Sequence, residues 1–295
     1  MTSGRATGSE QQPPAPEQLA DLATELAVAA GKLAVAGRSA GFDVDTKSSV
    51  TDVVTDVDRQ VEGFLVAELQ RRRPGDSVLG EEGGQRNLSS TGVRWLVDPI
   101  DGTVNFMLGL PVYAVSVAAE VEREVVAGCV TNPVSGEVFR SWLGGGAHLD
   151  DRVLTGPRSV PLAQAVVATG FGYDDGYRAQ QGKLVGELMA RVGNLRRLGS
   201  AALDLCSLAA GRIDLYFEGP LGEWDFAAGA LIAAEAGVVL SGLRGRPAGA
   251  AMVAGAHCDN AEEFFALLTE LGADRIADEF IARGQGIAAE AGQPS

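Results

Sequence analysis

The sequence contains few of the residues that support disulfide, zinc or histidine chemistry. Its 295 residues include three cysteines, Cys129, Cys206 and Cys258, and two histidines, His148 and His257. The cysteines are odd in number and far apart, so they provide neither a disulfide framework nor the spacing of a zinc site. Cysteines that stay reduced are typical of the cytoplasm, which is the location we expect. Because isolated histidines are more often structural than catalytic, we interpret both as structural.

Basic residues are scarce relative to acidic ones. Lys and Arg number 24 against 39 Asp and Glu, which gives a formal net charge of −15 at pH 7. This charge disfavours nucleic acids and anionic membranes as partners. No apolar run approaches the ~18 residues that would cross a membrane, and residues 1–16 lack the apolar core of a signal peptide. An anionic substrate would therefore need a bound cation to attract it.

Two nucleotide-binding motifs are missing as well. The chain has neither the P-loop pattern G-x-x-x-x-G-K-[ST] nor a strand followed by G-x-G-x-x-G. Since histidines and cysteines are also few, the chemistry is left to carboxylates.

What is present predicts a globular protein in two halves. Hydrophobic residues make up 46% and charged residues 21% of the chain, and the length fits one large domain or two ordinary ones. We expect a disordered tail rich in Gly, Ser, Gln and Pro at residues 1–16, and a marginal helix and loose tail at residues 276–295. Between them we expect an α+β half at residues 17–155 and an α/β half at residues 156–275.

Hydrophobic spacing supports this division. Two amphipathic stripes predict helices near the start of the chain, the first ending at Gly37 and the second before Pro74. Valine-rich runs over residues 112–134 predict a hairpin, and hence an antiparallel-rich sheet. After residue 156 strands and helices alternate, which is typical of an α/β fold.

Acidic side chains follow apolar runs at three separate places in the chain. Glu81 comes after a short apolar strand, Asp98 and Asp101 lie at the end of another, where Pro99 is expected to stop strand pairing, and Asp225 opens an apolar helix. Each place alone has an ordinary explanation as a solvated loop, a turn or a helix cap. If the three converge, four carboxylates share a small volume and repel each other unless cations neutralise them. Ligands that are all oxygen favour Mg²⁺ over zinc.

Gly102 and Thr103 add a possible anion site to this group. Gly102 lets the backbone approach a ligand closely. Its N–H group and that of Thr103 would stand at the start of a short helix, where phosphate oxygens bind readily.

An ordered set of motifs between about residues 45 and 240 resembles the inositol monophosphatase family, which comprises lithium-sensitive, magnesium-dependent phosphatases. The bacterial branch, with Val-Asn-Phe after Asp-Gly-Thr, is the most similar. The motifs are Lys47-Ser48-Ser49, Asp52-Val53-Val54-Thr55-x-x-Asp58, Gly80-Glu81-Glu82, Trp95-Leu96-Val97-Asp98-Pro99-Ile100-Asp101-Gly102-Thr103-Val104-Asn105-Phe106, Gly199-Ser200-Ala201-Ala202 and Trp224-Asp225-x-Ala227-Ala228-Gly229.

The resemblance implies a layered αβαβα sandwich and hydrolysis of phosphate monoesters, first of all myo-inositol 1-phosphate, by a metal-activated water. It also implies two to three Mg²⁺ ions, inhibition by Li⁺, a small phosphorylated substrate and a homodimer. By the same resemblance, the metal ligands are Glu81, Asp98, the carbonyl of Ile100, Asp101 and Asp225.

The other roles are implied in the same way. Thr103, hydrogen-bonded to Asp58, would orient the attacking water, and Glu81 would help to hold a third ion. Gly102 and Thr103 would hold the phosphate through their N–H groups. The alcohol portion would contact Asp101, Ala201 and Glu218. Glu82 and Lys47 would support the metal ligands from behind.

Two departures and several alternatives remain. Val50 stands where the family often has proline, and Glu223 places an extra acid beside the pocket, which leaves the choice of substrate open. Relatives with this constellation hydrolyse histidinol phosphate, fructose 1,6-bisphosphate or 3′-phosphoadenosine 5′-phosphate. An alternative of another class is a regulatory protein associated with RNA or RNA polymerase. The net charge disfavours it, and we interpret the basic triplet at residues 71–73 as the end of a helix.

Overall fold

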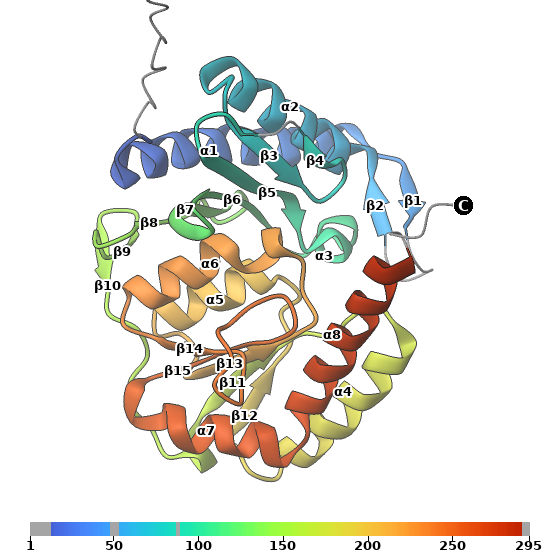
Figure 1. Cartoon of the computed structure of the whole chain (residues 1–295), viewed down its shortest axis with the longest axis vertical. Coiled ribbons are helices and arrows are strands. Elements are labelled where there is room, and N and C mark those ends of the chain that lie inside the picture. The colour runs from blue at the N-terminus through green and yellow to red at the C-terminus, as the bar shows by residue number, and fades with distance from the viewer. Residues whose placement is uncertain (1–12, 48–52, 87–88, 291–295) are drawn as a thin grey trace, which may run out of the picture.

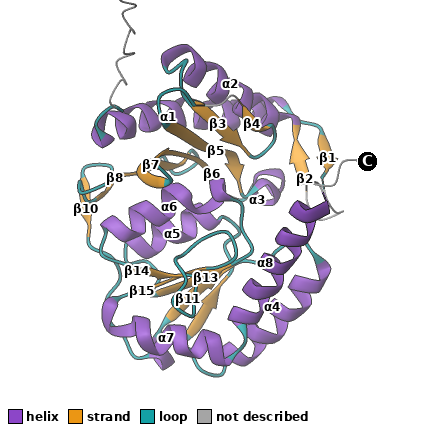
Figure 2. Cartoon of the chain, in the orientation of Figure 1, coloured by secondary structure: helices purple, strands orange, loops and turns teal. Residues whose placement is uncertain are grey.

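The computed structural model describes residues 13–47, 53–86 and 89–290, and it stacks helices and sheets in five layers (Figures 1 and 2). Helices α1 (Pro16–Ala40) and α2 (Asp56–Arg72) cover the outer face of an eight-stranded sheet. Helices α5 (Ala201–Ala209) and α6 (Glu223–Glu235) separate this sheet from a five-stranded one. Helices on the far side of the second sheet complete the αβαβα sandwich, which confirms the predicted fold class.

The eight-stranded sheet is antiparallel except where β3 pairs with β5, as the valine-rich runs predicted. Its order is β10-β9-β8-β7-β6-β5-β3-β4. The strands are β3 (Ser77–Gly80), β4 (Gly84–Arg86), β5 (Val93–Asp101), β6 (Ala114–Val121), β7 (Glu124–Asn132), β8 (Glu137–Trp142), β9 (Ala147–Leu149) and β10 (Arg152–Leu154). The small pair β1 (Val44–Thr46) and β2 (Val53–Thr55) lies beside it, and α3 (Thr103–Leu108) follows β5.

The five-stranded sheet is mixed, with the order β12-β11-β13-β15-β14. Strand β11 pairs in parallel with β12 and β13, and β15 pairs antiparallel with β13 and β14. The second half comprises the 3₁₀ helix η1 (Leu162–Gln164), β11 (Val166–Thr169), α4 (Asp175–Leu188), β12 (Asn194–Arg196), β13 (Leu215–Glu218), β14 (Val239–Ser241), β15 (Val253–Ala256), α7 (Cys258–Glu270) and α8 (Ala273–Glu290). Among the helices of the described residues, none has both the length and the apolarity needed to cross a bilayer.

Helix α1 extends beyond its predicted end at Gly37. Gly37 lies inside the helix, at the place where α2 packs against it. A larger residue does not fit there, because a Cβ on Gly37 would lie 2.8 Å from a methyl of Val57. The helix ends instead before Gly41, whose φ of 94° is a conformation that L side chains rarely adopt. The glycine at residue 37 therefore serves packing, and Gly41 serves termination.

Helix α8 corrects a second expectation, the loose tail from residue 276. The segment is helical through Glu290, and Ile276 and Ala277 are buried. Phe280 packs against the same core as these two residues. Apolar residues at these positions share one face of a helix, a pattern that the surrounding alanines and glycines obscured. The tail expected at residues 1–16 lies, up to residue 12, outside the described residues.

Strand β5 corrects a third expectation, because pairing continues past Pro99. Asp98 pairs with Ser116 and Asp101 with Ala114, so three steps on β5 match two on β6. This shift is a bulge, one of the places where a sheet tolerates proline's missing N–H.

The contact between α6 and the eight-stranded sheet yields a stability prediction. Gly128 on β7 faces Ala228 of α6, and a Cβ at residue 128 would lie 2.9 Å from the Cα of Ala228. Gly128→Ala should therefore push the helix from the sheet and lower the free energy of unfolding by about 1–3 kcal/mol. Gly63→Ala is the matched control, because Gly63 is exposed on α2 with open space around it. That change should raise stability by about 0.5–1 kcal/mol. Urea unfolding measures both, and a Gly128→Ala protein as stable as the parent would contradict this packing.

Candidate active site

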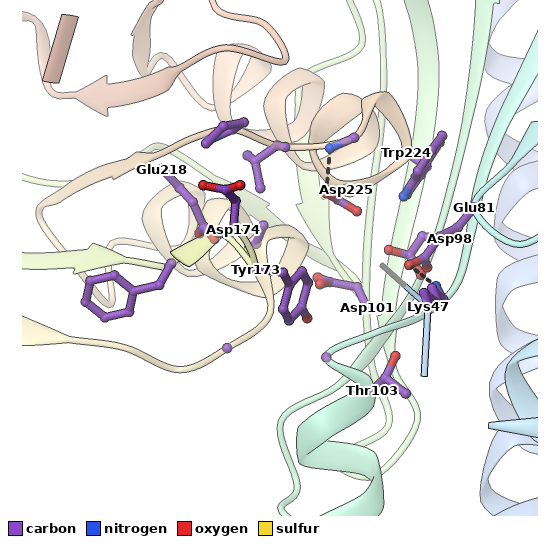
Figure 3. A pocket seen from close by; sticks show the side chains of 18 of the residues that line it. Lys47, Glu81, Asp98, Asp101, Thr103, Tyr173, Asp174, Glu218, Trp224 and Asp225 are labelled. Atoms are coloured by element: carbon purple, nitrogen blue, oxygen red, sulfur yellow. Dashed lines mark hydrogen bonds and ion pairs between the residues drawn. The ribbon is translucent and has the colours of Figure 1, made fainter. Parts of the chain in front are cut away.

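A pocket of about 410 Å³ is lined by residues of both sheets, at the carboxyl ends of β3, β5 and β13. Glu81 enters it from the turn after β3, Asp98 and Asp101 from the end of β5, and Asp225 from the first turn of α6. Glu218 enters from the end of β13. Figure 3 shows Glu81, Asp98 and Lys47 on one side and Glu218 on the other, with Asp101 and Asp225 between them. The convergence predicted for three distant acidic segments is thus present.

The bulge in β5 explains how Asp98 and Asp101 reach the same pocket. Side chains on a regular strand alternate between faces, so residues three apart point in opposite directions. One extra residue between Asp98 and Asp101 reverses the second of them. Pro99 marks the place of this extra residue, and the two carboxylates consequently line one cavity.

Asp98 is buried and lies among the other acids of the pocket. Its Oδ1 accepts a hydrogen bond of 3.0 Å from the N–H of Ile100. Burial raises the pKa of Asp98 well above its ordinary value, and the negative charges of Glu81, Asp101 and Asp225 raise it further. The acids of the pocket therefore carry more negative charge than its basic side chains, Lys47 and Arg197, can balance.

Asp101 joins the two halves of the chain. Its Oδ2 accepts hydrogen bonds from the Ser200 hydroxyl at 2.5 Å and from the N–H of Ala202 at 2.8 Å, both at the start of α5. Burial nevertheless raises the pKa of Asp101 to about 6. These contacts fix the carboxylate against α5, beside the lining residue Ala201.

Asp225 is held by the helix on which it lies. It occupies the first turn of α6, and its Oδ2 accepts a hydrogen bond of 2.8 Å from the N–H of Gly222, drawn in Figure 3. Burial raises the pKa of Asp225, and the charges of Asp101 and Glu81 add to this effect. Such a cap orients the side chain without neutralising it.

Lys47 contacts the acids after β3. Its Nζ donates a hydrogen bond of 2.7 Å to Glu81 Oε1 and forms an ion pair with Glu82. Burial still raises the pKa of Glu81 to about 7. Glu82 does not line the pocket and instead supports Lys47 from behind, while its N–H donates to Glu62 Oε2 at 2.7 Å. The neighbouring motif residues Ser48, Ser49, Val50 and Asp52 lie outside the described residues.

Thr103 and Asp58 meet at the floor of the pocket. The Thr103 hydroxyl lies 3.1 Å from Asp58 Oδ1 and 3.1 Å from the carbonyl of Ile100, so its proton is directed at these two acceptors. Asp58 Oδ2 accepts hydrogen bonds from the N–H, at 2.9 Å, and the hydroxyl of Thr55. Burial raises the pKa of Asp58. The pair lies in the arrangement that the sequence resemblance implied.

Gly102 occupies a position that only glycine fits. Its φ is 97°, and a Cβ there would lie 3.0 Å from the carbonyl oxygen of Gly199 and 3.1 Å from that of Val112. Gly102 caps α3, so its N–H and that of Thr103 open this helix at the pocket.

Glu218 stands at the opposite end of the pocket from Glu81. Its Oε2 accepts a hydrogen bond of 3.1 Å from the Tyr216 hydroxyl. Burial raises the pKa of Glu218 to about 7, with a further contribution from the charge of Asp101. Every residue expected to contact metal or substrate therefore lines this pocket; these are Glu81, Asp98, Ile100, Asp101, Gly102, Thr103, Ala201, Glu218 and Asp225.

Sequence reasoning missed one wall of the pocket. The lining residues that it did not single out include Tyr173, Asp174, Tyr177, Arg197 and Phe280. The segment at residues 171–174 follows β11, and ligands commonly bind beyond strand ends, so this signal was available. Nothing in the local pattern near Phe280 indicated a pocket residue.

The donor atoms of the pocket fit a hard divalent cation. Among the described residues, the ligating side chains that line it are carboxylates, no histidine or cysteine lines it, and its lining cations are Lys47 and Arg197. Such oxygen donors suit Mg²⁺. Elsewhere in the described residues, His257, Cys258 and Asp259 bring three possible ligand atoms within 4.8 Å of one another. The pocket acids are less tightly grouped than that, but this second group is more exposed and caps α7, which makes it the weaker candidate.

Comparison with known proteins agrees with the fold. The model of the inositol monophosphatase family matches residues 15–276. The inositol-1-monophosphatase of Mycobacterium leprae is 44% identical over 273 residues, covering 86% of this chain and 94% of the relative. The protein named Nus factor SuhB of Vibrio cholerae is 37% identical over 201 residues, covering 68% of this chain and 75% of that one. The solved structure of Mycobacterium tuberculosis SuhB superposes with a TM-score of 0.76 at 39% identity, covering 89% of this chain and 100% of that chain. The chain belongs to the inositol monophosphatase family.

Proposed function

We propose that the chain hydrolyses phosphate monoesters in this pocket, with myo-inositol 1-phosphate as its principal substrate. The observation that carries the proposal is the convergence of Glu81, Asp98, Asp101 and Asp225, four desolvated acids from three distant segments. These side chains, with the carbonyl of Ile100, would hold Mg²⁺. When bound, Mg²⁺ neutralises phosphoryl oxygens, activates a water and stabilises the leaving alkoxide.

Thr103 and Asp58 would position the attacking water. The Thr103 hydroxyl donates its proton toward Asp58 Oδ1, which leaves the oxygen of the hydroxyl free to accept a hydrogen bond from water. A water held in this way presents its own lone pair to phosphorus. Asp58, which accepts the Thr103 hydrogen bond, and Glu81, which lines the pocket, would help to take up the proton that the water loses.

The chain's other lining groups would hold the substrate. The N–H groups of Gly102 and Thr103 would donate hydrogen bonds to phosphate oxygens at the start of α3. Asp101, Ala201 and Glu218 lie farther along the pocket and would contact the hydroxyl groups of the alcohol. The name of the Mycobacterium leprae relative supports inositol 1-phosphate as that substrate.

A substrate panel tests this assignment. We expect kcat/KM with Mg²⁺ to be at least about tenfold higher for myo-inositol 1-phosphate than for three competitors, because contacts to the alcohol decide such ratios. The competitors are histidinol phosphate, fructose 1,6-bisphosphate and 3′-phosphoadenosine 5′-phosphate. If histidinol phosphate were hydrolysed preferentially, the assignment of myo-inositol 1-phosphate as substrate would be wrong, while the assignment of phosphate monoester hydrolysis would stand.

The Vibrio cholerae relative's name favours a second candidate, a regulatory protein associated with RNA or RNA polymerase. The net charge of −15 weighs against direct RNA contact. The triplet Arg71, Arg72 and Arg73 is engaged at the end of α2 by Glu68, Glu25 and Asp76. A salt-sensitive gel shift with RNA would favour this candidate.

Our proposal also includes inhibition by Li⁺, a homodimer and a cytoplasmic location, all implied by the family. The free thiols of Cys129, Cys206 and Cys258 support a reducing compartment.

Asp98→Asn tests the metal cluster. Because Asp98 is buried among three other acids, losing its charge should lower kcat by roughly 10³-fold or more while the thermal midpoint stays equal or rises. Asp151→Asn is the control, since Asp151 is an exposed acid in the turn between β9 and β10. It should change neither quantity. Normal turnover by Asp98→Asn would remove the cluster from the mechanism.

The raised pKa values predict how stability depends on pH. Those of Glu81 and Glu218 are about 7 and that of Asp101 about 6, against unfolded values near 4. The folded protein binds these protons more tightly than the unfolded chain does, so the stability they contribute is present below pH 4 and lost as pH rises to 7.

Thermal melts can measure this loss of stability with rising pH. Without divalent ions, the contribution of these groups should lower the melting temperature between pH 5 and pH 8. MgCl₂, compared with NaCl of equal ionic strength, should raise it more at pH 8 than at pH 5.5, because at acidic pH the ion must displace protons. An Mg²⁺ effect that is equal at both pH values, or larger at pH 5.5, would contradict the assignment.

A further inference from the structure

Helix α8 brings to the pocket a part of the chain that lies beyond the family match. The match ends at residue 276, whereas α8 continues to Glu290. Phe280, four residues past that end, lines the pocket. Figure 1 shows α8 running alongside α4 toward the same edge of the molecule as β1 and β2.

Contacts with α4 fix α8 in this place. The ring of Phe280 meets that of Tyr177 edge-on, with centroids 6.4 Å apart. The Arg283 guanidinium lies over the Tyr177 ring, 4.6 Å from its centroid, and its Nη1 lies 3.5 Å from Asp174 Oδ2. Glu279 pairs with Arg283 and accepts a hydrogen bond of 2.7 Å from the Gln180 amide. An edge-on ring contact, a cation–π contact and these polar contacts thus tie α8 to α4.

The residues so tied form one wall of the pocket. Phe171, Tyr173, Tyr177 and Phe280, hereafter the aromatic wall, all line it. In Figure 3, Asp174 lies beside Glu218, and Tyr173 lies beside Asp101. Tyr173, which is 45% exposed, is therefore near the two acids expected to contact the alcohol.

The size of the pocket leaves room for a ligand against this wall. Its volume of about 410 Å³ lies in the range of pockets that enclose drug-sized molecules. Aromatic rings in the same pocket as Asp101 and Glu218, the acids expected to contact the alcohol, suit an alcohol portion that carries a flat ring. Contacts between aromatic rings stabilise a bound ring beyond the effect of the area that they bury.

We propose that the aromatic wall, completed by Phe280 of α8, is an apolar subsite for phosphate monoesters whose alcohol carries an aromatic ring. The inference rests on the proposed function, because it assigns the phosphate to the acidic end of the same pocket. It makes the segment beyond the family match a determinant of specificity in this chain.

Phe280→Ala tests the subsite with two substrates that differ only in the ring, 2-phenylethyl phosphate and ethyl phosphate. The variant should lower kcat/KM for 2-phenylethyl phosphate about 5–10-fold, mainly through KM, and leave ethyl phosphate unchanged. Ile281→Ala is the matched control: it truncates the next side chain of α8, which does not line the pocket. It should change neither substrate. Equal losses on both substrates, or no change on either, would overturn the subsite.

Binding of phosphonates separates this inference from the proposed function. Calorimetry with 2-phenylethylphosphonate and ethylphosphonate needs no turnover and should show the same ring-dependent loss of affinity in Phe280→Ala. If the parent hydrolyses neither these esters nor myo-inositol 1-phosphate but the ring-dependent loss remains, the hydrolase proposal fails and the subsite stands. If the parent hydrolyses both esters and Phe280→Ala changes neither kinetics nor binding, the subsite fails and the hydrolase stands.

Arg283 provides a second test, as a positioning residue that reaches the ligand only through Tyr177 and Asp174. Arg283→Gln should raise KM for 2-phenylethyl phosphate two- to fivefold without changing KM for ethyl phosphate. Arg283→Lys keeps a cation above the ring and should restore most of the loss. An unchanged KM in Arg283→Gln would remove Arg283 from the subsite.

Discussion

Repulsion among carboxylates held out of water is the constraint on which this structure depends. Asp98 is surrounded by Glu81, Asp101 and Asp225, and each of these acids has a raised pKa because burial penalises its charged form. Among the described residues, the Lys47 ammonium forms ion pairs with Glu81 and Glu82. A fold that gathers such groups without balancing them has a pocket prepared for added positive charge, and divalent cations supply it most compactly.

Local devices hold the acids in place without neutralising them. A one-residue bulge turns Asp98 and Asp101 to the same side of β5. Backbone N–H groups hold one oxygen of Asp225 at the start of α6 and one of Asp101 at the start of α5. Since backbone donors carry only partial charges, they orient these carboxylates and leave most of the negative charge in the pocket. The two halves of the chain are joined by the same contacts that build the site.

The sequence predicted the layered fold and the meeting of the acids, because apolar runs, turn residues and family motifs are all local signals. It did not predict that β5 continues through Pro99, since a bulge depends on the partner strand. It placed the end of α1 at Gly37, because only the crossing of α2 shows that this glycine serves packing. It also missed Phe280 and expected only a marginal helix where α8 is continuous, because the apolar face of α8 has meaning only against α4. Contacts between distant segments account for each difference.

The central claim is that the pocket acids form a cation site. Crystals soaked in Mn²⁺ and measured at the manganese absorption edge test this directly. The account predicts anomalous peaks between Glu81, Asp98, Asp101 and Asp225. Electron density that shows these carboxylates with no anomalous peak between them would contradict it.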